Sequence, residues 1–169
     1  SSSLSAGLSF SNGIISGTPT VNMTQTMYTI WANNTGGSAS TTINMTINEP
    51  LATFSYSPST VVFTRGVSIT DMVPTLGGGD VATWEISPVL PSGLSLTNGI
   101  ISGTPTVNMT QTTYTVWANN TGGSVSTTIN ITINEPLATF SYSPSTVVFT
   151  RGVSITGLIP ILDGGDAAT

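Results

Sequence analysis

The sequence predicts an all-β protein built from tandem β-sandwich repeats of 86 residues, and three observations lead to this prediction. The chain repeats itself, because 67 of the 83 positions in residues 1–83 are identical to those in residues 87–169. Apolar residues alternate with polar ones at the period of a β-strand, and no window of the sequence carries a helical apolar stripe bounded by caps. Turn-forming residues separate about seven such runs within one repeat, which is typical of a β-sandwich.

The repeat boundaries are expected where strand-like alternation stops at a proline, after Pro50 and Pro136. One complete repeat then spans residues 51–136. Residues 1–50 are the C-terminal part of one repeat, and residues 137–169 are the N-terminal part of the next. These two outer parts cover 83 of the 86 positions. We interpret the chain as a window of a longer array; alternatively, the tail of one chain completes the head of the next, as in strand-complementation polymers.

The first expected strands of the complete repeat are runs of β-branched, aromatic and hydroxyl residues. They lie at residues 53–57, 60–64 and 67–70, separated by turn signals that contain proline or glycine. A further turn is expected at the glycine-rich residues 77–80, before a strand at residues 82–87.

Trp84, in that last strand, fits a core position between two sheets. Two short strands are then expected at residues 94–96 and 100–102, on either side of the turn signal Asn98-Gly99.

The strongest signal is a closing hairpin. In residues 125–134, a series of valine, threonine and three isoleucines alternates with hydroxyl and amide side chains, which indicates a half-buried strand. A similar run covers residues 113–118, and the connecting residues 119–123 are rich in asparagine and glycine. The two runs are therefore predicted to pair with each other.

Three motifs follow one another in the complete repeat: Leu90-Pro91-Ser92-Gly93-Leu94, Ile101-Ser102-Gly103-Thr104-Pro105, and Ala118-Asn119-Asn120-Thr121-Gly122-Gly123-Ser124. In this order and spacing, the sequence resembles the immunoglobulin-like (cadherin-like) repeats of bacterial and archaeal surface proteins. The resemblance covers about two thirds of a repeat. It implies tandem immunoglobulin-like β-sandwiches that serve outside the cell as spacers, stalks or adhesins, and it supplies no catalytic residue.

The composition excludes several kinds of chemistry. The chain has seven acidic residues and two arginines, and it has no lysine, histidine or cysteine. Thiolate and imidazole metal ligands, Ser-His and Cys-His nucleophile pairs and Schiff-base lysines are therefore absent from this sequence. Arg65 and Arg151 alone cannot form a basic patch, so no nucleic-acid partner is expected. No apolar run approaches the length that crosses a bilayer, so this segment is not expected to insert into a membrane.

The four acids in the middle of the chain, Glu49, Asp71, Asp80 and Glu85, are the candidates for an inter-domain calcium site. The clustered acidic runs that supply six or more oxygen ligands are missing, so calcium is not expected to bind. A paired-carboxylate hydrolase site is also poorly supported, because Asp71 is replaced by Gly157 in the neighbouring copy. The chain is therefore expected not to be an enzyme and to have no cofactor.

N-linked glycans are the one expected modification. Six asparagines begin the sequence Asn-x-Ser/Thr, a number that the abundance of asparagine and threonine partly explains. Several fall on the polar side of a predicted strand or in a predicted turn, where a glycan could attach. The candidate N-glycosylation sites are Asn22, Asn33, Asn44, Asn108, Asn119 and Asn130.

Trp31 and Trp117 are candidate contact residues, because alternation places them on the opposite face from Tyr28 and Tyr114. A tryptophan on such a face can stack on a sugar, but in a chain with so little charge we favour a contact between subunits.

We therefore expect a structural repeat of an extracellular filament, stalk or cell-surface layer, in which copies of the chain assemble head-to-tail. The alternative is an adhesin module that binds carbohydrate or another cell surface. A hydrolase accessory domain would need a catalytic neighbour that this sequence does not contain.

Overall fold

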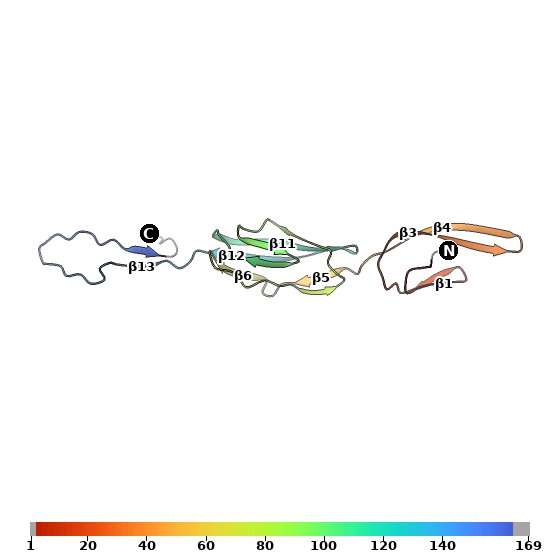
Figure 1. Ribbon diagram of the computed structural model, residues 1–169, viewed down its shortest axis with the longest axis horizontal. Helices are drawn as coiled ribbons and strands as arrows, with labels where there is room; N and C mark the ends of the chain where they lie inside the picture. Colours follow the sequence, from red (N-terminus) through yellow and green to blue (C-terminus); the bar gives the residue numbers. More distant parts are fainter. Residues whose placement is uncertain (1–2, 164–169) are drawn as a thin grey trace. The chain divides into compact units, whose positions relative to one another are not determined.

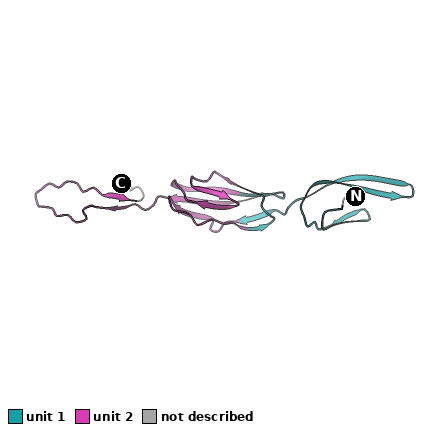
Figure 2. Cartoon of the chain, viewed as in Figure 1, with its two compact units in different colours: residues 1–54, 76–84, 117–126 teal, residues 55–75, 85–116, 127–169 magenta. Residues whose placement is uncertain are grey.

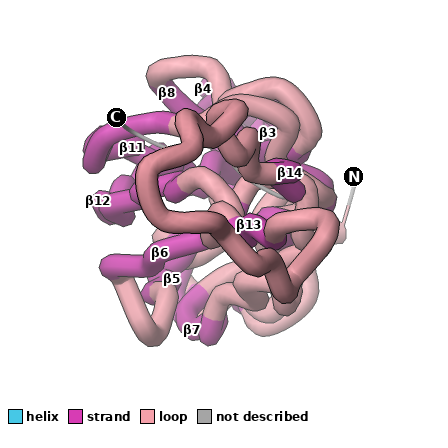
Figure 3. The backbone as a smooth tube through the Cα atoms, turned by 90° about the vertical axis from the view of Figure 1, so that its left-hand side faces the viewer, coloured by secondary structure: helices cyan, strands magenta, loops and turns pink. Residues whose placement is uncertain are grey.

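The computed structural model describes residues 3–163, and this part of the chain consists of β-strands and loops, which confirms the all-β prediction (Figures 1 and 3). Contacts divide the chain into two compact units (Figure 2). The first contains residues 1–54, 76–84 and 117–126, and the second contains residues 55–75, 85–116 and 127–169. The terminal residues 1–2 and 164–169 of the predicted outer repeats lie outside the described part.

Each strand of the described residues lies within one of the predicted ranges 1–50, 51–136 and 137–169. The N-terminal copy contains β1 (Leu8–Ser11), β2 (Ile14–Gly17), β3 (Met23–Asn34) and β4 (Gly37–Ile47). The middle repeat contains β5 (Ala52–Ser55), β6 (Thr60–Thr64), β7 (Thr75–Gly78), β8 (Thr83–Ser87), β9 (Leu94–Thr97), β10 (Ile100–Gly103), β11 (Met109–Asn120) and β12 (Gly123–Asn134). The C-terminal copy contains β13 (Thr139–Ser141) and β14 (Ile161–Asp163).

The largest sheet of the middle repeat has the strand order β6-β12-β11-β8. Its centre is the predicted closing hairpin, β11 and β12, whose turn is shorter than expected and covers residues 121–122. The parallel strand β6 pairs with the end of β12, from Asn130 opposite Thr60 to Asn134 opposite Thr64. Two smaller sheets, β5-β7 and β9-β10, complete the repeat.

The hairpin β9-β10 forms as the sequence predicts. Asn98 and Gly99 both have positive φ, 50° and 80°, which is the conformation of a type I′ turn. Asparagine tolerates this region and glycine adopts it without strain, so the dipeptide fixes the register in which Thr97 lies opposite Ile100. Asn12 and Gly13, the equivalent residues of the N-terminal copy, also have positive φ and form the same type of turn between β1 and β2.

Two local predictions were wrong. Residues 67–70 do not form a strand; this segment follows β10 through single hydrogen bonds, among them Ile69 N to Gly103 O at 2.9 Å, and an isolated bridge joins Met72 to Ile101. Residues 77–78, predicted as part of a turn, belong to β7. Glycine is needed there because a Cβ on Gly78 would lie 2.3 Å from the Leu51 carbonyl oxygen, so only a bare backbone can pair this closely.

The core of the second unit is made by the apolar sides of its strands. Ile101, Val116, Ile129 and Ile131 are completely buried, and Tyr114 is nearly so. Burying such side chains contributes about 1.5–3 kcal/mol each, which is the main source of stability in a repeat with so few charges. Trp84 is only partly buried, in contrast to its expected core position.

Trp84 instead meets Phe54 edge-on, with the ring centroids 4.9 Å apart, in the first unit. This arrangement is the preferred geometry of an aromatic pair.

Tyr56 anchors the loop after β5. Its buried hydroxyl donates a hydrogen bond to the Gly99 carbonyl oxygen in the turn of β9-β10. Because the surroundings disfavour a phenolate, burial raises the pKa of Tyr56 to about 12, and burial also raises the pKa of Tyr114. Both phenols are therefore neutral at physiological pH, which suits a structural role.

Candidate functional site

A polar cluster holds the chain segment that enters the middle repeat. The side chain of Asn120 donates to the Pro50 carbonyl oxygen at 2.8 Å and to the Asp80 carbonyl oxygen at 3.0 Å. The hydroxyl of Thr121 accepts a hydrogen bond from the Glu49 backbone amide at 2.8 Å. The turn between β11 and β12 thus holds the Glu49-Pro50 segment through hydrogen bonds. The sequence did not predict this role of Asn120 and Thr121.

An ion pair fastens the other end of the same repeat. Arg65, directly after β6, donates from Nε to the Glu135 carboxylate at 2.9 Å, and its backbone amide donates to the Asn134 carbonyl oxygen, also at 2.9 Å. Both side chains are about one third exposed, so the pair contributes at most about 1 kcal/mol. Its main effect is to define where β6 ends against β12.

The N-terminal copy leaves partly exposed an apolar face whose equivalent is buried inside the middle repeat. Ile101 and Val116 are completely buried in the middle repeat, whereas their equivalents Ile15 and Ile30 are partly exposed. In the middle repeat, residues 55–75 pack on this side, and no described residue does so in the N-terminal copy. We call the apolar face of the N-terminal copy that contains Ile15 and Ile30 the head face. Apolar members of the hollow on it are Leu4, Leu8, Phe10, Ile15, Tyr28 and Ile30.

In the C-terminal copy, the segment equivalent to β6 has no partner strand among the described residues. Residues 146–150 repeat the sequence of β6 but do not form a strand. β6 exists because β12 supplies its hydrogen-bond partners, and no described residue does this for residues 146–150. Among the apolar side chains left exposed are Phe140, Tyr142, Phe149 and Leu158. We call residues 137–163 the tail segment.

The sequons differ in accessibility between the copies. Asn119 and Asn130 are partly buried, although they were expected to face solvent. Asn130 accepts from the Thr113 hydroxyl at 2.7 Å and donates to the Thr60 hydroxyl, while Asn119 donates to the Thr83 hydroxyl. A glycan on either nitrogen would have to replace these contacts. The remaining four, Asn22, Asn33, Asn44 and Asn108, are exposed.

The two candidate contact tryptophans are placed differently. Trp31 is 59% exposed, and Trp117 is partly buried. Tyr28 and Tyr114, three residues earlier on the same strands, are buried, which is the alternation that the sequence predicted.

The acids considered for calcium do not converge. In residues 3–163, no group of three or more histidine, cysteine, aspartate or glutamate side chains is close enough to hold a metal ion. The same part of the chain has no helix that is long and apolar enough to cross a membrane.

The middle repeat is an immunoglobulin-like domain. Its residues 52–134 match the family model described as "Putative Ig domain", which supports an immunoglobulin-like domain in this part of the chain. The match confirms the immunoglobulin-like domain that the resemblance implies for this repeat. Domains of this kind are generally surface or structural modules and are typically non-catalytic. No curated protein matches the sequence.

Proposed function

We propose that the chain is a structural module of an extracellular filament, stalk or cell-surface layer, and that it acts by joining copies of itself head-to-tail. The observation that carries this proposal is the near-identity of its 86-residue repeats, with 67 of 83 compared positions the same. In a linear array each repeat buries its own core, and the junctions set the spacing, so stability grows by the addition of equal units.

The contacts at the ends of the middle repeat support this role. Asn120 and Thr121 hold the segment that enters the repeat, and the Arg65–Glu135 pair holds the segment that leaves it. Exposed hydroxyl and amide side chains, together with the open apolar surfaces of the outer copies, offer further contacts that need no charged partner. Glycans on the exposed sequons would serve such a module by hydrating a surface with few charges.

Electron microscopy of the purified chain tests the proposal. We expect fibres with an axial repeat that corresponds to one or two 86-residue units. Dispersed particles of single-chain size at every concentration would contradict it.

A second candidate is an adhesin module that binds carbohydrate, which is favoured by the exposed indole of Trp31 in the lining of the hollow on the head face. Binding to a glycan array that is lost in Trp31→Ala or Trp117→Ala, without loss of folding, would support this alternative. We favour the structural role because the repeats are nearly identical, as in a linear array of equal units.

A further inference from the structure

Methionine supplies all the sulfur in this chain, and one methionine position is common to two copies of the repeat. The sequence has five methionines and no cysteine. A shift of 86 residues relates Met23 to Met109, whereas the other three methionines have a different residue at the equivalent position. These residues are Thr113 for Met27, Ile131 for Met45 and Leu158 for Met72. A thioether is thus retained at one position and exchanged for other side chains at three.

At the retained position, the sulfur accepts a hydrogen bond from a tyrosine of the same strand. In β11 the Tyr114 hydroxyl donates to Met109 Sδ at 3.3 Å, and in β3 the Tyr28 hydroxyl donates to Met23 Sδ at 3.3 Å. Tyr114 is 2% exposed and Tyr28 is 8% exposed. A hydroxyl that is buried this far needs an acceptor, and a thioether is a weak one. The same contact recurs in both compact units.

The sulfur of this pair can be reached from solvent. Met109 is partly exposed and lines a hollow of about 550 Å³, in which Asn108, Gln111 and Asn134 supply polar side chains. Met23 is partly exposed as well. A hydroperoxide is small enough to enter a hollow of this size.

We propose that Met109 and Met23 are oxidation sites at which the chain consumes hydroperoxides without losing its fold. The thioether sulfur attacks the outer oxygen of the hydroperoxide, the O–O bond breaks as the S–O bond forms, and a proton passes to the departing oxygen. Sulfur gives up two electrons, and the products are methionine sulfoxide and an alcohol, or water when the oxidant is hydrogen peroxide. This inference goes beyond the proposed function and does not depend on assembly of the chain.

The tyrosine hydroxyl is the reason that the fold tolerates the sulfoxide. A sulfoxide oxygen is polar, and it disrupts a core when no donor reaches it. Tyr114 already directs its hydroxyl at the sulfur, and burial raises the pKa of Tyr114, so the phenol stays protonated. A methionine side chain turns about three bonds, so the new oxygen can accept the hydrogen bond that the sulfur accepted.

Met72 has a different environment in the same repeat. It is 9% exposed, and an isolated bridge joins it to Ile101, which is completely buried. Its sulfur forms no hydrogen bond among residues 3–163. We therefore expect a sulfoxide at Met72 to destabilise the repeat, which makes this residue a matched control for Met109.

Treatment of the full chain with hydrogen peroxide tests the proposal. The background variant carries Met27→Thr, Met45→Ile and Met72→Leu, which are the residues of the equivalent positions, so that only Met23 and Met109 can form sulfoxides. Peptide mass mapping measures the oxygen gained at each site, and thermal unfolding measures the effect on the fold. We expect both sites to gain one oxygen and the Tm to fall by less than about 4 °C, which is less than the loss of one hydrogen bond would cause.

Removal of the donor should make the same oxidation harmful. In the background variant with Tyr114→Phe, we expect oxidation to lower the Tm by about 4–8 °C. Adding Met109→Leu to that variant should abolish this shift, because the effect passes through the sulfur. A chain that keeps Met72 and carries Met109→Leu is the second control, and oxidation should lower its Tm by more than about 8 °C.

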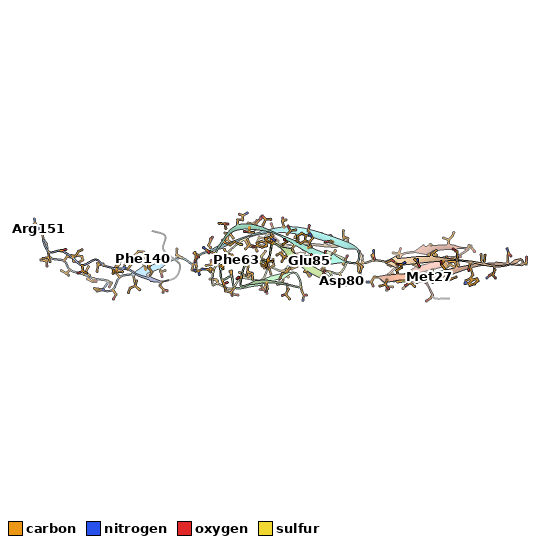
Figure 4. All side chains as sticks on the ribbon, turned by 90° about the horizontal axis from the view of Figure 1, so that it is seen from above. Met27, Phe63, Asp80, Glu85, Phe140 and Arg151 are labelled. Carbon is orange, nitrogen blue, oxygen red and sulfur yellow. The ribbon has the colours of Figure 1, made fainter. Side chains whose placement is uncertain are left out.

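Three results would overturn the inference. Met109 of the folded, unsubstituted chain could stay unoxidised when Met27, which is 64% exposed (Figure 4), is fully converted. This result would mean that the hollow does not admit the oxidant. Oxidation could lower the Tm of the background variant as much as that of the Tyr114→Phe variant, or Met72 could be oxidised without any loss of stability. Either result would show that the tyrosine hydroxyl does not protect the fold.

Discussion

The two isoleucines Ile101 and Ile15 allow the same substitution to be made at equivalent places in nearly the same sequence. Both are the second residue of a short strand that follows an Asn-Gly turn, and their neighbours are identical from residue 12 to residue 26 and from 98 to 112. Ile101 is completely buried and bridged by Met72, whereas Ile15 is partly exposed on the head face. Only the covering segment distinguishes the two sites.

Ile101→Ala removes a completely buried side chain and leaves a cavity, so we expect it to lower the free energy of unfolding by about 3 kcal/mol, within the range of about 2–5 kcal/mol for such changes. For a domain of this size, that loss lowers the Tm by about 12–24 °C. Ile15→Ala removes a side chain that already touches water and should cost less than about 1 kcal/mol.

The assay is urea and thermal unfolding followed by circular dichroism, at a low micromolar concentration where the chain is dilute. Ile101→Val is a useful control, with an expected loss of about 0.5–1.5 kcal/mol. Equal effects of Ile101→Ala and Ile15→Ala under these conditions would refute the argument, because they would mean that the head face is covered in the single chain.

Three further predictions concern the middle repeat. Because the pKa of Tyr56 is raised to about 12, the neutral phenol favours the folded state, and this contribution of about 2–3 kcal/mol is lost as the pH rises from 10 towards 12. Tyr56→Phe should therefore flatten the decline of stability that unfolding experiments measure between pH 9 and pH 12. Gly103→Ala places a Cβ 2.1 Å from the Gly93 carbonyl oxygen at φ 123°, so it should lower the free energy of unfolding by more than about 3 kcal/mol. Gly66→Ala, at φ 78° in open space, should lower it by only about 1–2 kcal/mol in the same denaturation assay. Asn120→Ala should expose the Pro50 segment to faster proteolysis, and the equivalent change Asn34→Ala should not, because that side chain bonds only its own turn among the described residues.

The fold could be predicted where local chemistry decides the structure. The turn at Asn98-Gly99 and the alternation in residues 125–134 each specify one conformation, and the structure has both. The glycines of β7 could not be predicted as a strand, because the reason for their pairing is the close approach of β5, which lies about 25 residues earlier in the chain.

The clearest limit of sequence reasoning is the pair of identical segments 60–64 and 146–150. Residues 60–64 form a strand and residues 146–150 do not, so the local sequence alone does not determine the structure. The difference is that β12 lies beside residues 60–64 and supplies their hydrogen-bond partners. For the same reason, the candidate site was only partly visible in the sequence. The shift of 86 residues was enough to relate Arg151 to Arg65, but the ion pair with Glu135 that gives this relation its meaning appears only in the structure.

Sedimentation equilibrium of the purified chain over a range of concentrations tests the central claim most directly. If copies of the chain join to one another, the average molecular mass rises continuously as the concentration rises. The mass of a single chain at every concentration would contradict the account.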